Sequence, residues 1–580
     1  MYLKPELAAF LQNNDLPSES TILEVTESLK APLSELQEVE AEIQRLGELV
    51  EVMKMKRQNI QKIINDHNII LSPVRRLPAD VLHEIFFHCL PIRHNPIVKY
   101  SECPLLLTRI CSSWRAIALA SPRIWSKIHI PLPGDPSVSE GFNGTISEEP
   151  RRSDYSQIFT RVMRSRCDIV RSWLSRSGTC PLSLSVTCSG GASRMQNSKD
   201  EELTRTMFDI LLSFADRWSV VVLSMPEDIY HKLQGDINPT VFSLLISLNT
   251  TLHRQYEGVN TESVPIRLLA APALRRIAIH DIQTTSPKSG TLVHQPIWNP
   301  ITHITFTSPT TDRYLLILLK QCPNLVFGKF IVTPSPQWSD HIIIDKESEL
   351  LLPRLESLDI NDCGTYETMT IMFKAIKAPA LTRLLYRQYS LRSFQPNSIV
   401  AFPIAPVIPL LENSTLINAL SLDSGISSQD TYKCLQRGAQ VTHIVFGRPL
   451  TPNTYNGFTP ITTPQDPFDL KILSIDSMEM TLLPRLESVE AYYLSSLTDE
   501  DLLDMITSRI HASQRGEVAA LKSVKILFQR HRQKDITEDV SRLAKEAGIE
   551  VKLDLTYVAE SPILLDRLCP SFGLTLNEDV

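Results

Sequence analysis

The first periodic segment of the chain has apolar residues at alternating spacings of three and four. These residues are Leu36, Val39, Ile43, Leu46, Val50, Met53 and Ile60, and Arg57 takes the one charged position of the series. The same register continues upstream through Ile22, Val25 and Leu29, where Pro32 is expected to interrupt it. Such spacing predicts a heptad helix with one apolar seam in the N-terminal segment, residues 1–70.

The apolar seam of this helix has to be covered by another surface. Self-association as a coiled coil and packing back onto the chain's own domain are two alternatives, because the seam spans only three to four heptads. Arg57 would be costly in the middle of a tight dimer, although its aliphatic stem could lie along the seam. It therefore favours a weak or an intramolecular contact.

The second periodic segment, residues 76–91, reads RLPADVLHEIFFHCLP. Pro78 suits the first position of a helix, Asp80 suits its first turn, and Pro91 would end it. Between them, apolar residues form two adjacent columns at a spacing of four: Val81, Leu82, Ile85, Phe86, and Cys89 or Leu90. We expect a short helix that buries much of its surface.

A second short helix is expected at residues 104–122, PLLLTRICSSWRAIALASP. Its apolar residues would share one face, and they are Leu107, Ile110, Cys111, Trp114, Ile117 and Ala118. Ser121 and Pro122 then begin a turn that carries Trp125, and a strand follows at residues 127–130. A unit of this size has too little core to be stable alone, so we expect it to complete its core against a partner.

The remainder of the chain repeats irregularly. A Pro-x-Leu turn that leads into an alternating strand recurs in APALRRIAIHDI, CPNLVFGKFIV, LPRLESLDINDC, APALTRLLYRQY and LPRLESVEAYYL, at intervals of about 25 to 40 residues. Two helix-and-strand units precede these segments, and a helix, Gly548 and a closing strand end the series. Units that cannot bury their own apolar faces have to stack, so the pattern predicts an α/β solenoid that resembles degenerate leucine-rich repeats. The proline-rich segments 283–300 and 447–469 would be edge loops.

Composition restricts the class of function further. The chain has 580 residues, a net charge of -7 and a pI near 6.1, which give no basic surface for nucleic acid or anionic membrane. Ten cysteines without a CxxC pair, and an N-terminus without an apolar leader, favour an intracellular protein of the cytoplasm or nucleus. No cofactor, metal or catalytic motif is found: the spacing of His83 and His88 does not suit a shared metal on a helix. The carboxylates Glu356, Asp359 and Asp362 are expected to be solvated on the repeat surface.

The two short helices together resemble an F-box. The matching residues are Leu77, Pro78, Val81, Leu82, Ile85, Phe86, Cys111, Trp114, Arg115, Pro122 and Trp125. The layout, with a coiled-coil lead-in and the later segment WLSRSGTCPLSLSV, is similar to the large F-box family of mushroom-forming basidiomycete fungi. The resemblance covers about a tenth of the chain.

This resemblance implies the function of a substrate receptor. The box would bind a Skp-type adaptor, and through it a cullin–RING ubiquitin ligase, while the repeats bind an unknown target protein. The residues expected to contact the adaptor are Leu77, Pro78, Val81, Leu82, Ile85, Phe86, Ile110, Trp114 and Trp125. An interaction scaffold whose box no longer binds an adaptor is the alternative.

The expected fold class is therefore α plus α/β, without enzymatic activity of its own. Its predicted parts are a helical segment at 1–70, the box at 71–130, a linker at 131–153 and the repeat solenoid at 154–580.

Overall fold

The chain divides into two compact units, Met1–Glu84 and Ile85–Val580, and the boundary lies inside the helix α3 (Ala79–His88). The computed structural model describes residues 11, 16–132, 152–188, 198–234, 237–253, 266–280, 298–333, 349–363, 366–388, 405–422, 428–447, 470–475, 481–494 and 496–557. Most of the two predicted edge loops lies outside these residues. The predicted boundaries at 70, 130 and 153 remain predictions.

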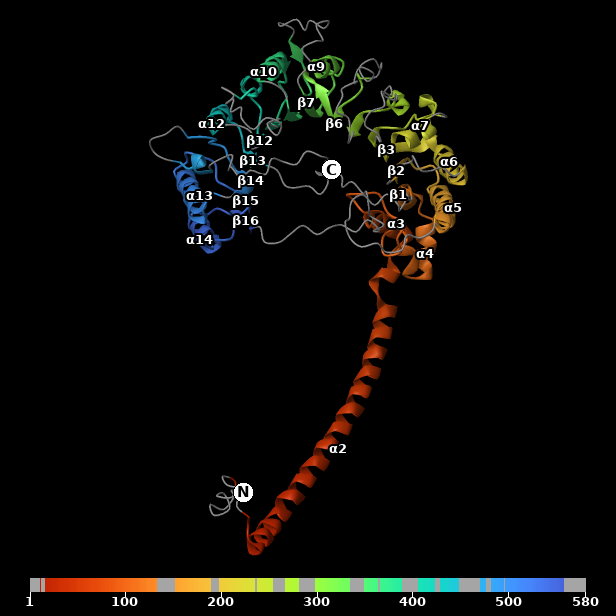
Figure 1. Cartoon of the computed structure of the whole chain (residues 1–580), viewed down its shortest axis with the longest axis vertical. Helices are drawn as coiled ribbons and strands as arrows, with labels where there is room; N and C mark the ends of the chain where they lie inside the picture. Colours follow the sequence, from red (N-terminus) through yellow and green to blue (C-terminus); the bar gives the residue numbers. More distant parts are fainter. Residues whose placement is uncertain are drawn as a thin grey trace. The chain divides into compact units, whose positions relative to one another are not determined.

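One long helix, α2 (Glu19–Leu71), dominates the first unit (Figure 1). Ser18 caps it, because its Oγ accepts a hydrogen bond from the backbone N–H of Thr21 at 3.2 Å. The helix continues through Pro32, so the interruption expected at this residue was wrong. An internal proline removes one amide donor, and a helix of 53 residues keeps its other turns on either side.

The heptad seam of α2 lies on its surface. The seven apolar seam residues between Leu36 and Ile60 are each 45–63% exposed. No residue of α2 is buried among the residues that the structure describes. The 3₁₀ turn η2 (Pro73–Arg76) then connects α2 to α3.

A parallel sheet of 14 strands organises the described part of the second unit. Its strands pair in chain order, each with the one before and the one after, apart from two short strands that form a separate pair. The sheet comprises β1 (Lys127–Leu132), β2 (Leu182–Cys188), β3 (Trp218–Pro226), β4 (Ser247–His253), β5 (Arg276–His280), β6 (His303–Thr311), β7 (Phe327–Thr333), β9 (Ser357–Asp362), β11 (Arg383–Gln388), β12 (Ala419–Leu422), β13 (His443–Phe446), β14 (Ser488–Leu494), β15 (Ser523–Phe528) and β16 (Lys552–Tyr557). The separate pair is β8 (Leu350–Leu351) and β10 (Ile376–Lys377).

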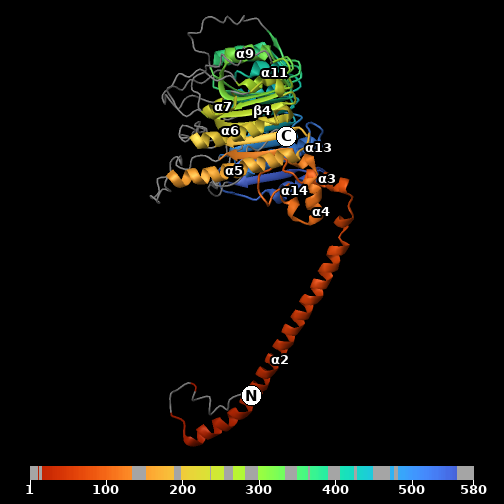
Figure 2. The ribbon, with the colours of Figure 1, turned by 90° about the vertical axis from the view of Figure 1, so that its right-hand side faces the viewer.

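Helices cover one face of this sheet (Figure 1). Figure 2 shows α5, α6 and α7 stacked in chain order, as the strands are. These helices are α5 (Arg152–Arg176), α6 (Ser198–Leu212), α7 (Glu227–Gln234), α9 (Asp312–Lys320), α10 (Tyr366–Ala375), α11 (Ile408–Asn413), α12 (Ser428–Arg437), α13 (Asp499–Gln514) and α14 (Thr537–Glu546). The 3₁₀ turns η6 (Ala215–Arg217), η7 (Pro239–Val241), η8 (Arg267–Ala270) and η10 (Leu470–Leu473) lie between them in the chain. A long helix plus a parallel sheet with helices confirms the expected α plus α/β class.

The core of the second unit contains a row of aliphatic side chains that crosses the sheet from strand to strand. The second residue of most strands occupies this row, because parallel pairing keeps the strands in register. The row comprises Ile128, Leu184, Val221, Leu248, Ile277, Ile304, Leu358, Leu384, Leu420, Ile444, Val489, Val524 and Leu553. All of these except Leu553, on the last strand, are buried.

Gly328 interrupts the aliphatic row on β7. A Cβ atom at this position would lie 2.6 Å from Cε2 of Phe330, two residues along the same strand. The Phe330 ring, which is fully buried, therefore occupies the volume that an aliphatic side chain fills on the other strands. Phe330 can therefore adopt this position only because residue 328 has no side chain.

The recurrent Pro-x-Leu pattern is a tight turn that precedes a strand. In each case the carbonyl of the residue before proline accepts a hydrogen bond from the leucine N–H, at 3.1–3.3 Å. The turns begin at Ala271, Cys322, Leu352, Ala378 and Leu483 and end at the buried residues Leu274, Leu325, Leu355, Leu381 and Leu486. Proline presets the backbone of the second turn position, and the leucine anchors the turn in the core.

The strands expected after these turns are confirmed as β5, β7, β9, β11 and β14. The expected strands at β1, β2, β3 and β16 are also present. Gly178 and Gly548 follow α5 and α14 with positive φ, at 56° and 68°, a conformation that glycine commonly adopts just after a helix.

Candidate functional site

The apolar side chains of α3 form two columns with opposite environments. Leu82 and Phe86 are buried, whereas Val81 and Ile85 are 40% and 38% exposed. Residues four apart share a helix face, so the exposed pair forms a short apolar stripe. The predicted helix is present with Asp80 in its first turn, but it begins at Ala79, one residue after Pro78, and ends at His88, before Pro91.

The second expected helix is divided at Cys111. The 3₁₀ turn η3 (Leu107–Arg109) precedes it and α4 (Ser112–Leu119) follows it. The backbone of Cys111 is extended, and its Sγ accepts a hydrogen bond from the N–H of Trp114 at 3.4 Å. This residue therefore caps α4, and the expectation of one continuous helix was wrong. Ile110, expected on the shared apolar face, is 53% exposed.

Aromatic contacts tie the short elements of the second unit together. The rings of Phe86 and Trp114 lie 4.9 Å apart between centroids. Trp125, in η4 (Pro122–Trp125), donates its indole N–H to the carbonyl of Ala118 at 2.8 Å and meets the ring of Trp173 edge-on at 4.8 Å. Since Trp173 belongs to α5, the segment that contains α4 and η4 shares its core with the first helix of the sheet.

The nine residues that the sequence predicts as an adaptor surface differ in exposure. Pro78, Val81, Ile85 and Ile110 are exposed, Leu77 and Trp114 are half-buried, and Leu82, Phe86 and Trp125 are buried. The buried residues support the short elements from inside, while the exposed ones present apolar surface to solvent. Their role in binding remains a prediction.

A cluster of polar side chains lies on the second face of the sheet, opposite the aliphatic row. It consists of Lys329 on β7, Asp359 and Asn361 on β9, and Arg387 on β11. Strand register sets Lys329 beside Asp359 and Arg387 beside Asn361. Nη1 of Arg387 donates to both carboxylate oxygens of Asp359, at 3.0 and 3.2 Å, and lies 3.3 Å from Oδ1 of Asn361. We call this group the second-face cluster.

The second-face cluster carries more positive than negative charge. Asp359 is buried and has two cationic neighbours, since Nζ of Lys329 lies 3.8 Å from its Oδ2. Nε of Arg387 is buried without an acceptor among the described residues. Burial, with a smaller contribution from the charge of Lys329, lowers the pKa of nearby His280 to about 4, so this imidazole is neutral at pH 7. The arrangement suits an acidic group of a partner.

Two of the three carboxylates expected to be solvated are buried. Asp359 is held by the second-face cluster, and Asp362 accepts a hydrogen bond from the hydroxyl of the buried Tyr386 at 2.6 Å. Only Glu356 of these three is exposed, as expected. The expectation was wrong for Asp359 and Asp362 because their strand lies inside a sheet, where cross-strand partners replace water.

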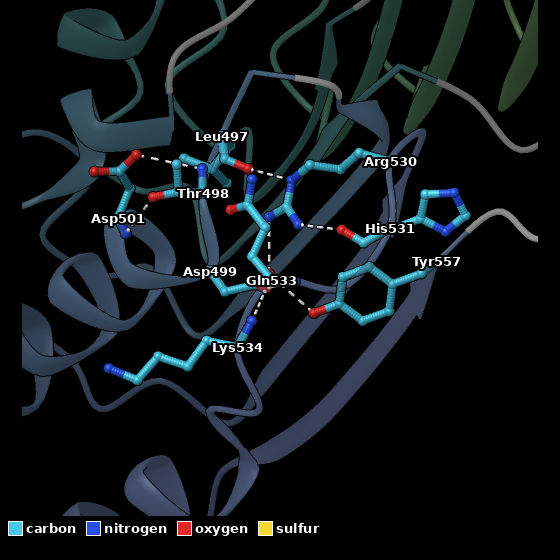
Figure 3. A network of polar contacts seen from close by, with 9 residues as sticks. All are labelled: Leu497, Thr498, Asp499, Asp501, Arg530, His531, Gln533, Lys534 and Tyr557. Carbon is cyan, nitrogen blue, oxygen red and sulfur yellow. Dashed lines mark hydrogen bonds and ion pairs between the residues drawn. The ribbon is translucent and has the colours of Figure 1, made fainter.

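A second polar network joins the start of α13 to the segment after β15 and to β16, with Asp499 at its centre (Figure 3). Oδ1 of Asp499 accepts hydrogen bonds from Nη2 of Arg530 at 2.8 Å and from the hydroxyl of Tyr557 at 2.9 Å. Oδ2 accepts from the backbone N–H groups of Gln533 and Lys534, both at 2.8 Å. Two donors thus reach each oxygen of a fully buried carboxylate.

The electrostatics of Asp499 indicate a structural role. Burial alone would raise the pKa of this carboxyl group, but hydrogen bonds from Arg530, the two amides and Tyr557 outweigh it and bring the pKa to about 2. Burial and the bond to Asp499 raise the pKa of Tyr557 to about 12. Since its donors come from the segment after β15 and from β16, Asp499 fastens the last two strands to the start of α13.

Neither polar network was predicted from the sequence, although the spacing of residues after the turns contains a signal for the second-face cluster. When the turns ending at Leu325, Leu355 and Leu381 are aligned, Lys329 and Asp359 both lie four residues after the leucine. By the same alignment, Asn361 and Arg387 both lie six residues after it. Aligned turns imply aligned strands, so the amino-acid sequence alone could have identified these neighbours. The partners of Asp499 come from an irregular loop, and no comparable signal exists for them.

Neither a scan against protein-family models nor a search of curated proteins found a match for this sequence. Among the described residues, no group of three or more His, Cys, Asp or Glu side chains is placed to hold a metal ion. The helices in the described part of the chain are also too short or too polar to span a membrane.

Proposed function

We propose that this chain is an F-box-type substrate receptor, which binds a Skp-type adaptor through α3 and α4 and a target protein through the sheet. The adaptor would connect it to a cullin–RING ubiquitin ligase in the cytoplasm or nucleus. In this proposal the chain performs no chemistry. It raises the effective concentration of the target near the ligase and orients it for transfer.

The exposed column of α3 is the observation that carries the proposal. Its residues Val81 and Ile85 belong to the resemblance, yet they are not used in the core, while Leu82 and Phe86 of the same motif are. One column of the motif thus packs the helix into the core, and the other column is exposed to solvent. The exposed column is suited to bind an apolar surface of a partner. Buried anchors at the centre of an interface carry most of its binding energy.

The sheet supports the proposed repeat architecture, and its second face offers a surface on which a target could bind. Parallel strands in chain order, a recurrent turn and one aliphatic row are the features that we expect of degenerate leucine-rich repeats. We propose that the second face binds the target, with the cationic groups Lys329 and Arg387 meeting an acidic residue. Partner residues of that charge would gain from the excess positive charge of the second-face cluster.

Co-purification with a Skp-type adaptor tests the proposal. The full chain should retain the co-expressed adaptor through size-exclusion chromatography. The double variant V81E/I85E should weaken this binding by more than about tenfold, because it places two charges in the apolar stripe that the adaptor would cover. Both positions are exposed, so the variant should unfold at the same urea concentration as the native chain.

A matched control separates docking from a general effect of added charge. L416E introduces a carboxylate at an exposed aliphatic position just before β12, where it should leave adaptor binding unchanged. Equal retention of the adaptor by V81E/I85E and L416E would reject the α3 surface. A native chain that never retains the adaptor would favour the alternative, an interaction scaffold whose box does not bind.

A further inference from the structure

Because α2 is longer than the segment 36–60, its apolar seam is also longer than the sequence pattern alone indicated. The helix extends from Glu19 to Leu71, so the seam continues in register beyond residues 36–60. The added positions are Ile22, Val25, Leu29 and Pro32 upstream and Ile64, His67 and Leu71 downstream. None of these residues is buried. A single helix with an uncovered apolar seam of this length requires a partner of matching length.

We infer that the partner is a second copy of this chain, whose α2 binds antiparallel with the twofold axis at the level of Glu48. The inference concerns α2 alone and does not depend on the proposed function.

The charge distribution along α2 sets the direction of pairing. Residues 19–48 contain eight glutamates against one lysine and one arginine. Residues 51–71 contain Lys54, Lys56, Arg57 and Lys62 against Glu51 and Asp66. A parallel pair would place acidic halves side by side and basic halves side by side. An antiparallel pair places each acidic half along a basic half, which favours this direction.

The parallel register also has two local conflicts. Position 57 would face itself across the seam, so two Arg57 side chains would meet in the apolar interface. Glu35 and Glu40 occupy flanking positions that oppose each other in a parallel heptad pair, and they repel. The first conflict lies in the packed seam, and the second lies along its edge.

The antiparallel register removes these conflicts. Arg57 then faces Val39 of the second copy, and its stem can lie along the seam with the charge at the edge. The seam pairs Leu46 with Val50, Ile43 with Met53, and Leu36 with Ile60, so each of these layers is apolar.

The flanking positions fit this register as well. Glu42 of one copy faces Lys56 of the other, and Glu40 faces Lys54, each twice because of the symmetry. In the single chain, Glu42 pairs with Arg45 and Lys54 with Glu51, both at 2.7 Å on the exposed helix surface. Exposed pairs of this kind contribute little, so they can be exchanged for contacts between the two copies.

Charge reversal in the full chain tests both the dimer and its direction. Light scattering should give twice the mass of the chain at micromolar concentration. E40K/E42K should weaken the dimer by roughly tenfold to a hundredfold, because it turns four attractive pairs into repulsive ones. Adding K54E/K56E to the same chain should restore it. The control E38K/E48K makes the same charge change on the outer face of the helix and should have little effect.

Cysteine pairing gives an independent readout of the register. The variants L46C and V50C, mixed and oxidised, should form a disulfide between the two different chains, identified by peptide mass spectrometry. Neither variant alone should link its own position to itself. A monomer at all concentrations, a tighter dimer for E40K/E42K, or self-linked L46C and V50C chains would each overturn the inference.

Discussion

At the scale of single residues, Gly328 and Phe330 form one packing unit. G328A should destabilise the second unit by about 1–3 kcal/mol, because its Cβ would overlap the Phe330 ring. F330A should cost about 3–5 kcal/mol, because it removes a fully buried aromatic side chain. The double variant G328A/F330A should cost less than the sum of the two, since the new methyl group occupies part of the emptied volume. Urea unfolding of the four proteins measures this coupling, and additive effects would contradict it.

Asp499 makes a second residue-scale prediction, which concerns pH. Its folded pKa of about 2 lies below the ordinary 3.8, so its contribution to stability is present above pH 4 and is lost as pH falls towards 2. The pKa difference corresponds to about 2 kcal/mol.

D499N should therefore lower the free energy of unfolding at pH 7 by at least that amount, because its amide nitrogen replaces one of the two acceptor oxygens. In either orientation of the amide, that nitrogen faces two donors whose hydrogen bonds it cannot accept. The deficit should shrink as the pH falls below 4. D554N, at an exposed position of β16, is the control and should change little. A deficit for D499N that stays constant down to pH 3 would show that the carboxylate charge is not what fastens the last strands.

At the scale of elements, the turns show how far the sequence could predict the fold. Strands preceded by Pro-x-Leu were found, but β4, β6 and β13 were missed, although the same hydrogen-bonded turn precedes each of them. Those turns end at Leu245, Ile301 and Val441, and none has proline at its second position. The physical requirement is a tight turn with a buried aliphatic residue at its end, and proline only makes some of these turns easier to recognise.

The short helices α3 and α4 show what the periodicity of apolar residues cannot predict. Periodicity predicted the two columns of α3 but not which column would be buried, because both are equally apolar. It also predicted one continuous helix where Cys111 begins a new one, since a thiol cap leaves no periodic trace. Periodicity indicates which residues share a face, whereas burial depends on neighbours that are distant in the sequence, such as Trp173 behind Trp125.

At the scale of the whole molecule, the sheet grows by adding strands in chain order, so its stability depends on how each end is finished. The last strand, β16, is suited to an edge: Lys552, Asp554 and Thr556 are exposed polar residues that discourage further pairing. An interior strand such as β12 has no such protection, because Leu420 and Leu422 are buried between its neighbours.

Ending the chain after Leu422 should therefore cause aggregation. The truncation removes β13 to β16 and their helices. The backbone groups of β12 that pair with β13 then lose their partners, and the leucines of β12 lose cover on that side. A chain that ends after Tyr557 keeps β16 and is the matched control, which should remain soluble in sedimentation and light-scattering measurements. If the shorter chain is soluble, monomeric and unfolds in a single transition, then β1 to β12 form an independent domain, and the sheet is not one cooperative array.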